Sequence, residues 1–378
     1  MTATLQPPVR RRAAQAVPVR LERRLDQPGR IHSALLPVGS LLLAMVLVGV
    51  LLGIAGHDPF AALSQVVSAA VTGQGSISAT LTSATPLLFT GLAAAVAFRM
   101  RIWNIGGEGQ LYIGAICAAG VGIATGASGL AVALPLMLIA AALGGALWAA
   151  IPALLRAFLN TNEILTSLML NYVAGLLLGY LILDSTSYWR DMSGPTALVY
   201  PQGKSLASAA FWPGFTGGGL IIPLGLVFGV ALAVLVFVMI RHTWFGYQLR
   251  VTADNAQAGR YAGMASRRNL VAVMMLSGAL AALGGASQVG DFSHLLDPSG
   301  LQQPQYGYTG IVVAALARYN PLAVVLSALF LGAITNAGLN LQSATFPQSL
   351  TGVIEGIILF CVLGGEVLSR YRFVWGRR

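Results

Sequence analysis

Polar side chains interrupt an otherwise apolar sequence in the segment FRMRIWNIGGEGQ, residues 98–110. Asn104, Glu108 and Gln110 carry oxygen atoms that can accept hydrogen bonds from a polar solute, and a carboxyl group can also carry a proton. Three glycines lie among these residues and permit an irregular, closely packed backbone. Polar groups at membrane depth need partners in protein or water. The segment is therefore a candidate lining of a solute path or a gate.

The same segment has a second interpretation as an ordinary helix start. Glu108 would then lie near a helix N-terminus, where a negative charge is favourable, and close to Arg99 or Arg101. The sequence leaves both interpretations open. The other polar residues in or beside apolar runs are Glu163, Asn171, Asn336 and Glu355. We add Asn171 and Glu355 to the candidate path, because polar groups inside a membrane are functional candidates by default.

The sequence lacks the motifs of catalysis and nucleotide binding. Gly203–Ser205 reads Gly-Lys-Ser, but Leu198 stands where a phosphate-binding loop has its leading glycine. Four histidines are scattered over different loops, and Cys117 and Cys361 lie in apolar runs that suit packing. We therefore expect no catalytic residue, no metal and no cofactor in this chain. If ATP drives its function, another chain must bind the ATP.

The composition predicts an all-α, polytopic bundle of transmembrane helices. Of 378 residues, 56% are apolar and 9% are charged, whereas soluble domains carry about 25% charged residues. Lipid offers no partner to unpaired backbone groups, so every span should be helical. The ten predicted spans are 34–54, 78–98, 105–124, 130–150, 164–183, 218–240, 269–289, 306–317, 321–341 and 349–368. The span 306–317 is short and could be a half-span.

The distribution of Lys and Arg predicts the orientation of these spans. With the N-terminus in the cytoplasm, all of the 22 basic residues except Arg190 and Lys204 fall on the cytoplasmic side. Both chain ends are then cytoplasmic. The net charge of +10 is thus a topology signal and predicts no nucleic-acid partner. Residues 1–30 are rich in Arg and Pro and predict a disordered tail, and residues 31–378 form the transmembrane domain.

Glycines four residues apart could let helices pack closely, either within the chain or at a dimer seam. The pairs inside predicted spans are Gly49 with Gly53, Gly175 with Gly179, Gly225 with Gly229, and Gly352 with Gly356. Packing within the chain is the simpler explanation.

The longest cytoplasmic loop, residues 241–268, contains signals of a short helix. Asp254 and Asn255 could cap its start, Gly263 could end it, and Ser266 could cap the next span. Such a helix, with Tyr261 and small residues, suits docking into a groove of another protein. A basic loop attracted to anionic lipid explains it equally well. Outside, residues 184–216 hold several aromatics that suit the membrane interface or a soluble receptor.

Two segments resemble a known family: FRMRIWNIGGEGQLYIGA and RHTWFGYQLRVTADNAQAGRYAGM. They are similar to permease subunits of bacterial ABC importers in the branched-chain amino acid, ribose and nucleoside group. Residues 104–110 and the stretch NEILTSLMLNYVA, residues 162–174, resemble the nucleoside and simple-sugar subgroup. Subgroup members often have Gly-Glu-Asn-Pro in the cytoplasmic loop, where this chain has Ala-Asp-Asn-Ala at residues 253–256.

The resemblance implies a bacterial inner-membrane complex of two permeases and two ATPases, fed by an extracytoplasmic binding protein. The second permease would be a similar but distinct chain. The residues implied to couple this chain to the ATPase are Arg250, Asp254, Asn255, Arg260, Tyr261 and Gly263. The expected function is alternating-access import of nucleosides, with a ribose-like sugar as the alternative substrate. An ion-coupled secondary transporter, with Glu108 or Glu355 as relay groups, is the alternative of a different class.

Overall fold

The computed structural model describes residues 19–23, 30–54, 56, 58–194, 199–340, 352–354, 356–358, 360–361, 364–365 and 371–375. The chain divides into two compact units. The larger is Leu51–Glu355, and the smaller combines Met1–Val50 with Gly356–Arg378. In the smaller unit, strand β1 (Val19–Arg23) pairs antiparallel with β4 (Tyr371–Trp375). Half of the predicted tenth span, residues 349–368, lies outside the described residues, and so does Glu355.

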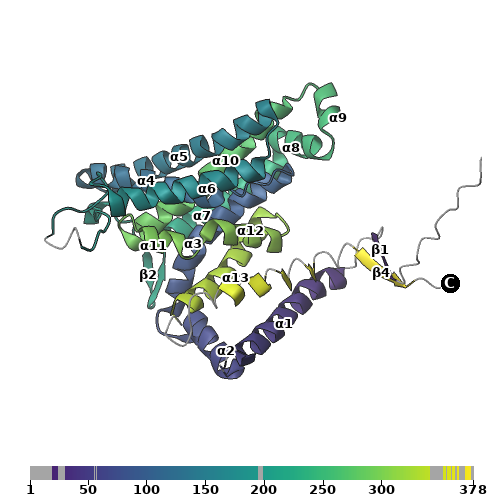
Figure 1. The fold of residues 1–378 in the computed structure, drawn as a ribbon, viewed down its shortest axis with the longest axis horizontal. Coiled ribbons are helices and arrows are strands. Elements are labelled where there is room, and N and C mark those ends of the chain that lie inside the picture. Colours follow the sequence, from purple (N-terminus) through teal and green to yellow (C-terminus); the bar gives the residue numbers. More distant parts are fainter. Residues whose placement is uncertain are drawn as a thin grey trace, which may run out of the picture. The chain divides into compact units, whose positions relative to one another are not determined.

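The larger unit is mostly helical. Its helices are α2 Pro59–Val67, α3 Ser76–Arg99, α4 Gly107–Thr125, α5 Leu130–Leu159, α6 Glu163–Gly179, α7 Leu224–His242, α8 Trp244–Asp254, α9 Ala256–Tyr261, α10 Ser266–Ser287, α11 Pro298–Gln302, α12 Tyr306–Leu316 and α13 Pro321–Asn340. Helix α1, Arg30–Ile54, covers the predicted first span. Figure 1 shows α8 and α9 at one end of the unit and β2 at the other.

Within the described part of the chain, six helical segments are long and apolar enough to cross a membrane. They are Ser76–Arg99, Leu130–Leu159, Glu163–Asp184, Leu224–His242, Ser266–Ser293 and Pro321–Gly338. These segments match six of the predicted spans to within a few residues at most ends. The prediction of a multi-pass helical membrane protein is therefore confirmed, because water could not solvate so many exposed apolar side chains.

One predicted boundary is wrong and one helix was missed, each for an identifiable reason. The span predicted to begin at residue 218 begins at Leu224, because Phe215–Gly217 and Leu220–Ile222 form the hairpin β2–β3. Its turn places Gly218 and Gly219 at φ angles of 59° and 81°, which glycine adopts easily. Helix α2 was not predicted, although Asp58 caps it by accepting hydrogen bonds from the N–H groups of Phe60 and Ala61 at 2.9 and 3.3 Å.

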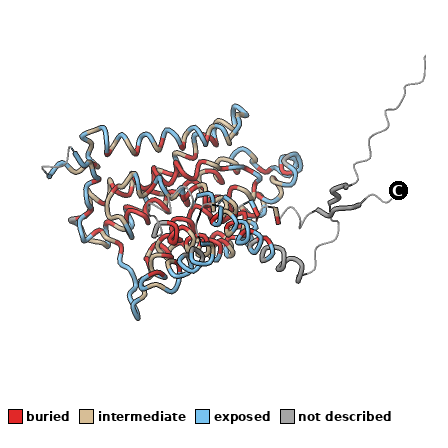
Figure 2. Tube along the Cα trace, turned by 60° about the horizontal axis from the view of Figure 1, so that its bottom comes forward, coloured by how far each residue is buried: buried red, intermediate tan, exposed pale blue. Residues whose placement is uncertain are grey.

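The core of the larger unit is built around α3 and α10. Helix α10 packs against α3, α4 and α5, and α3 also packs against α12 and α13. Of the membrane-length segments, α3 is 83% buried, whereas the segment beginning with α6 is 22% buried. Figure 2 shows the buried residues gathered in the interior, with exposed residues along the outer helices. Helix α6 therefore offers most of its surface to lipid or to another subunit.

Glycines allow α10 to approach its neighbours closely. A Cβ at Gly278 would overlap the Gly145 carbonyl oxygen on α5, and a Cβ at Gly285 would overlap the Leu111 carbonyl oxygen on α4. Among the predicted pairs, Gly225 with Gly229 packs tightly within the chain, whereas Gly179 faces open space. The close crossings therefore lie mostly at glycines that the spacing rule did not select.

Gly278→Leu should destabilise the crossing of α5 and α10. Its side chain would overlap backbone atoms, and overpacking of this kind costs about 1–3 kcal/mol or more. Thermal unfolding of the purified protein in detergent should show a lower midpoint. The control is Gly179→Leu, since no atom lies within 4 Å of a Cβ at that position. Equal midpoints for the two variants would contradict the assigned packing.

Candidate functional site

Glu108 binds the beginning of helix α12 from a neighbouring helix. It lies in the first turn of α4 and is 2% exposed. One carboxylate oxygen accepts hydrogen bonds from the Gly307 and Tyr308 N–H groups at 2.5 and 3.3 Å. The other accepts from the Tyr112 hydroxyl at 2.6 Å. The N-cap residue of α12 has no side-chain capping bond, so Glu108 supplies the cap from another helix.

This geometry corrects one interpretation of the sequence. Glu108 does lie at a helix start, but its partners are Tyr112 and the backbone of α12, not Arg99 or Arg101. The contact between Glu108 and Tyr112 is the local one, because residues four apart lie on the same face of a helix. The contact with α12 joins Glu108 to Gly307, 199 positions away, and no local sequence pattern predicts it.

Asn171 ties α6 to the same place. Its side-chain oxygen accepts from the Gly109 N–H at 2.9 Å. Its amide nitrogen donates to the Ile105 carbonyl at 2.8 Å and to the Tyr308 hydroxyl at 3.2 Å. A Cβ at Gly109 would come within 2.9 Å of Asn171, so this position requires glycine. The starts of α4 and α12 and the middle of α6 are thus joined by polar side chains.

Asn104 and Gln110 form a second, deeper cluster. Their amide groups exchange two hydrogen bonds of 3.0 Å each. Asn104 also donates to the Ser277 hydroxyl at 2.8 Å, and Ser277 donates to the Ala93 carbonyl at 2.7 Å. Both amide residues are at most 3% exposed. The structure therefore places Asn104 and Gln110 where they fix α4 against α3 and α10, away from any described cavity.

A groove of about 600 Å³ runs along α6 beside Glu108 and Asn171. This volume is within the range of small-molecule sites. Its polar and aromatic lining residues are Glu108, Tyr112, Asn171, Tyr172, Gln302, Gln305 and Tyr308. The rings of Tyr172 and Tyr308 can stack on a flat solute, and the amides of Gln302 and Gln305 can exchange hydrogen bonds with it. Tyr112 is buried, and the Asn171 amide is bonded within the chain. Two of the predicted path residues, Glu108 and Asn171, line this groove.

Sequence analysis missed the groove residues outside its motifs. Gln302 and Gln305 lie in and after the short helix α11, and Tyr308 lies in the first turn of α12. No periodic pattern singles them out. Gln305 has a φ of 50°, which marks a break between α11 and α12. The α12 helix is 11 residues long, or about 16 Å, and covers nearly all of the short span predicted at 306–317.

The other polar candidates have structural partners. Glu163 pairs with Arg156 at 3.3 Å, while the preceding Asn162 caps α6. The Asn336 amide donates to the Ala69 carbonyl at 3.0 Å and thereby holds α13. Across the part of the chain that the structure describes, no group of three or more His, Cys, Asp or Glu side chains could hold a metal ion.

The segment 241–268, which was predicted as a cytoplasmic loop, contains the two helices α8 and α9. Helix α9 begins after Asn255, whose side chain accepts from the Gln257 and Ala258 N–H groups at 2.9 and 3.1 Å. It is followed by Gly263 at a φ of 73°. The predicted cap and stop are therefore confirmed. Tyr261, the last residue of α9, is 94% exposed, so its ring is free to contact another protein.

Three other residues of this segment, Arg250, Asp254 and Ser266, do not take part in α9. Arg250 and Asp254 lie on α8, a helix the sequence did not suggest. Asp254 does not cap α9 but pairs with Arg101 at 3.2 Å on the exposed surface, a contact that contributes little to stability. Ser266 makes no cap, because its hydroxyl has no hydrogen-bond partner.

The opposite end of the unit carries the aromatic segment 184–216, which was predicted to lie outside. The Trp189 indole N–H donates to the Ile116 carbonyl at 2.9 Å, and the Phe211 ring stacks on His294 with centroids 3.8 Å apart. Burial lowers the pKa of His294. Ser193 donates two hydrogen bonds to Asp191 and lowers the pKa of that carboxyl. These contacts anchor the segment to α4 and to His294, which follows the helical segment Ser266–Ser293.

Comparison with known proteins identifies relatives over most of the chain. The chain is 35% identical to the glucose ABC transporter permease protein TsgB13 of Haloferax volcanii, covering 89% of this chain and 88% of the relative. It is 30% identical to the guanosine ABC transporter permease protein NupP of Bacillus subtilis, covering 92% and 97%. It is 26% identical to the nucleoside ABC transporter permease protein NupB of Lactococcus lactis, covering 88% and 91%.

A family model described as branched-chain amino acid transport system, permease component, matches residues 76–363. This range includes α3 to α13 and so contains the groove, the buried polar clusters and the α8–α9 segment. Since the match covers more than half of the 378 residues, the chain belongs to the family of permease components of branched-chain amino acid transport systems.

Proposed function

We propose that this chain is the permease subunit of an ATP-driven importer and moves nucleosides into the cytoplasm. The observation that carries the proposal is the groove beside Glu108 and Asn171, which combines phenol rings with amide groups. A nucleobase offers a flat ring for stacking and polar edges for hydrogen bonds, and ribose adds hydroxyl groups. The guanosine and nucleoside permeases among the relatives support this choice.

A sugar is the second candidate substrate. The relative with 35% identity is a glucose permease, and amide and carboxylate groups also bind sugar hydroxyls. The Tyr172 and Tyr308 rings of the groove favour the nucleoside, because a planar base gains more from stacking on a ring than a sugar does.

We infer about ten spans with both chain ends in the cytoplasm. The six membrane-length helices, together with α1 and α12, support this topology. The distribution of arginine agrees with it, since only Arg190 and Lys204 fall outside. The tail at residues 1–30, in which residues 19–23 form strand β1, and the permease domain at 31–378 remain predictions of the same scheme.

The expected partners are two ATPase subunits, a second permease and an extracytoplasmic binding protein. Helix α9, with Arg260 and the exposed Tyr261, offers the surface on which an ATPase subunit would dock. The groove is open on the side of α6, where a second permease could complete it. The outer aromatic segment would meet the binding protein.

Transport would proceed by alternating access. The break at Gln305 separates α11 from α12, and Glu108 holds the first turn of α12. Movement of α9 with the ATPase would shift α8 and α10, which contact it. Asn104 and Gln110 then position α4 against α10, while Glu108 and Asn171 line the path. Glu355 stays a predicted path residue that lies outside the described residues.

The substrate is tested with the purified complex of permeases, ATPases and binding protein in liposomes. We expect guanosine to raise the rate of ATP hydrolysis and to be preferred over glucose by at least about tenfold, equivalent to about 1.4 kcal/mol. Stimulation by glucose alone would establish the second candidate instead. Uptake that stops with an uncoupler while ATP stays high would indicate ion coupling and overturn the proposal.

Tyr261→Ala should reduce uptake about tenfold or more while leaving the amount of protein in the membrane unchanged. Its ring is exposed on α9 and contributes nothing to the chain's own core, whereas buried aromatics at interfaces often dominate binding. Uptake and membrane abundance are measured in the same cells. The matched control is Tyr180→Ala, which removes a ring that is 56% exposed in the helical segment Glu163–Asp184. Normal uptake after scrambling residues 254–263 would refute the docking role.

Glu108→Gln should reduce uptake about tenfold, because a hydrogen bond to a charged group is worth about 1.5–3 kcal/mol. The amide keeps the volume but removes the negative charge at the start of α12. Asp58→Asn is the control, since Asn caps a helix as well as Asp does. Thermal unfolding is measured beside uptake. Unchanged uptake in the Glu108 variant would show that the cap of α12 has no part in transport.

A further inference from the structure

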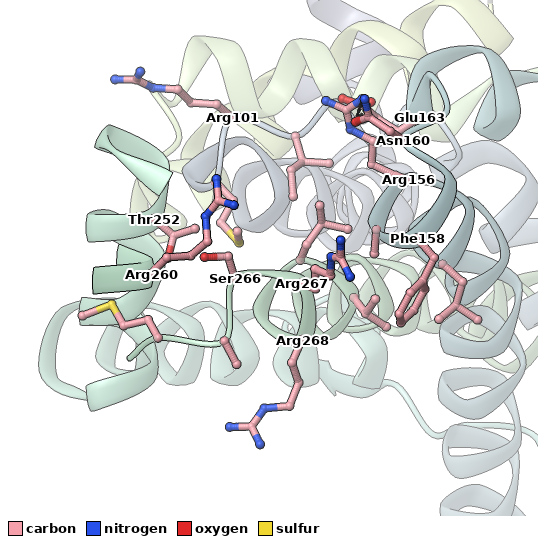
Figure 3. A pocket seen from close by; sticks show the side chains of 18 residues that line it. Arg101, Arg156, Phe158, Asn160, Glu163, Thr252, Arg260, Ser266, Arg267 and Arg268 are labelled. Atoms are coloured by element: carbon pink, nitrogen blue, oxygen red, sulfur yellow. Dashed lines mark hydrogen bonds and ion pairs between the residues drawn. The ribbon is translucent and has the colours of Figure 1, made fainter. Parts of the chain in front are cut away.

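A second cavity lies where α5 ends and α10 begins. It has a volume of about 1050 Å³ and is lined by the end of α5, the turn before α4, and the segment from α8 to the start of α10. Figure 3 shows the side chains around it. We call it the arginine pocket, because five arginines line it: Arg101, Arg156, Arg260, Arg267 and Arg268.

The positive charge of the arginine pocket is mostly uncompensated. Glu163 is its one acidic lining residue, and Glu163 pairs with Arg156. Arg101 pairs with Asp254, which lies outside the lining. Among the described residues, Arg260, Arg267 and Arg268 form no ion pair. In Figure 3 the guanidinium groups of Arg260 and Arg267 approach the pocket from two sides, whereas Arg268 extends away from it.

Two hydroxyl groups at the pocket have no partner. The Thr252 and Ser266 oxygens are both buried and make no hydrogen bond. Thr252 is 8% exposed as a whole residue. A buried hydroxyl without a partner carries a desolvation cost, so both positions favour an occupant that exchanges hydrogen bonds. This observation is independent of the arginines and points to the same place.

The start of helix α10 is a third feature of the arginine pocket that favours an anion. It begins at Ser266 without a side-chain cap and without an acidic residue in its first turn. Its first backbone N–H groups and its dipole therefore favour an anion at this end. Two guanidinium groups, two hydroxyls and a helix N-terminus together match the oxygen atoms of a phosphate group, because all five can donate hydrogen bonds to it.

The other wall of the pocket is apolar. Leu154 and Phe158 from α5 face Leu270 and Val271 from α10. Phe158 is 64% exposed, and the Arg267 guanidinium lies 5.8 Å from its ring centroid. Both α5 and α10 are membrane-length segments, so their adjacent ends lie at the level of the lipid head groups. An occupant of this pocket meets charge on one side and hydrocarbon on the other.

We propose that the arginine pocket binds a phosphate-bearing anion, namely the head group of an acidic membrane lipid. The phosphodiester would accept from Arg260, Arg267 and the two hydroxyls, and an acyl chain would lie on Phe158 and its apolar neighbours. The lipid would then rest against the base of α9, between the membrane and the surface that Tyr261 exposes. A soluble phosphate shares the charged half of this chemistry but has nothing to place on the apolar wall.

The test uses the full chain, purified and reconstituted in nanodiscs that contain phosphatidylglycerol and phosphatidylcholine. Native mass spectrometry counts the lipids that stay bound. We expect preferential retention of phosphatidylglycerol. Arg267→Ala should reduce that retention about tenfold, the effect of losing one charge-assisted hydrogen bond. Arg268→Ala is the matched control, because it removes the same charge from the next residue and should change retention less than about twofold.

Two further arms separate the alternatives. The double variant Thr252→Val with Ser266→Ala leaves every charge in place and should still weaken retention. Inorganic phosphate added at millimolar concentration should not displace the lipid. Displacement by phosphate would assign the site to a soluble anion and overturn the lipid assignment. Equal losses in the Arg267 and Arg268 variants, or no preference between the two lipids, would refute the pocket as a specific site.

Discussion

The structure depends on how a helix can begin inside a membrane. Lipid provides no partner for the first N–H groups of a helix, yet α12 starts among the spans. Glu108 solves this by accepting from the Gly307 and Tyr308 N–H groups, and Tyr112 holds its second oxygen. The groove forms beside this carboxylate because the chain must break at Gln305 to let α12 begin. The same carboxylate, that of Glu108, therefore caps α12 and lines the groove.

Helix α10 connects this arrangement with the opposite end of the unit. Its glycines bring it against α4 and α5 at backbone contact, so small side-chain motions cannot absorb a shift of the helix. Ser277 on α10 binds Asn104, which pairs with Gln110 two residues after Glu108. Near its start, Asn269 binds Gln248 of α8 at 3.2 Å. Contiguous packed groups thus join the α8–α9 segment to the groove, as coupling between distant sites requires.

Sequence reasoning succeeded where the signal is local and failed where it is not. Apolar length located the spans, and Asn255 with Gly263 located α9. The hairpin at Phe215–Ile222 was absorbed into a span because its residues are as apolar as the helix that follows. Asn104, Glu108 and Gln110 were recognised as a group by spacing, but the sequence could not divide them between two clusters. That division depends on Ser277 and Gly307, which lie 173 and 199 residues away.

The arginines near the predicted cytoplasmic ends of the spans carry two kinds of information. Their number on one side sets the orientation of the chain, and for that role any arginine in a short loop serves equally well. Orientation alone does not require Arg260 and Arg267 to converge on one cavity beside unpartnered hydroxyls. Because Arg260 and Arg267 are exposed to water, the case for an occupant rests on the two buried hydroxyls beside them, which make no hydrogen bond. These hydroxyls and the converging arginines together indicate a bound counter-charge, and the apolar wall beside them indicates that the membrane supplies it.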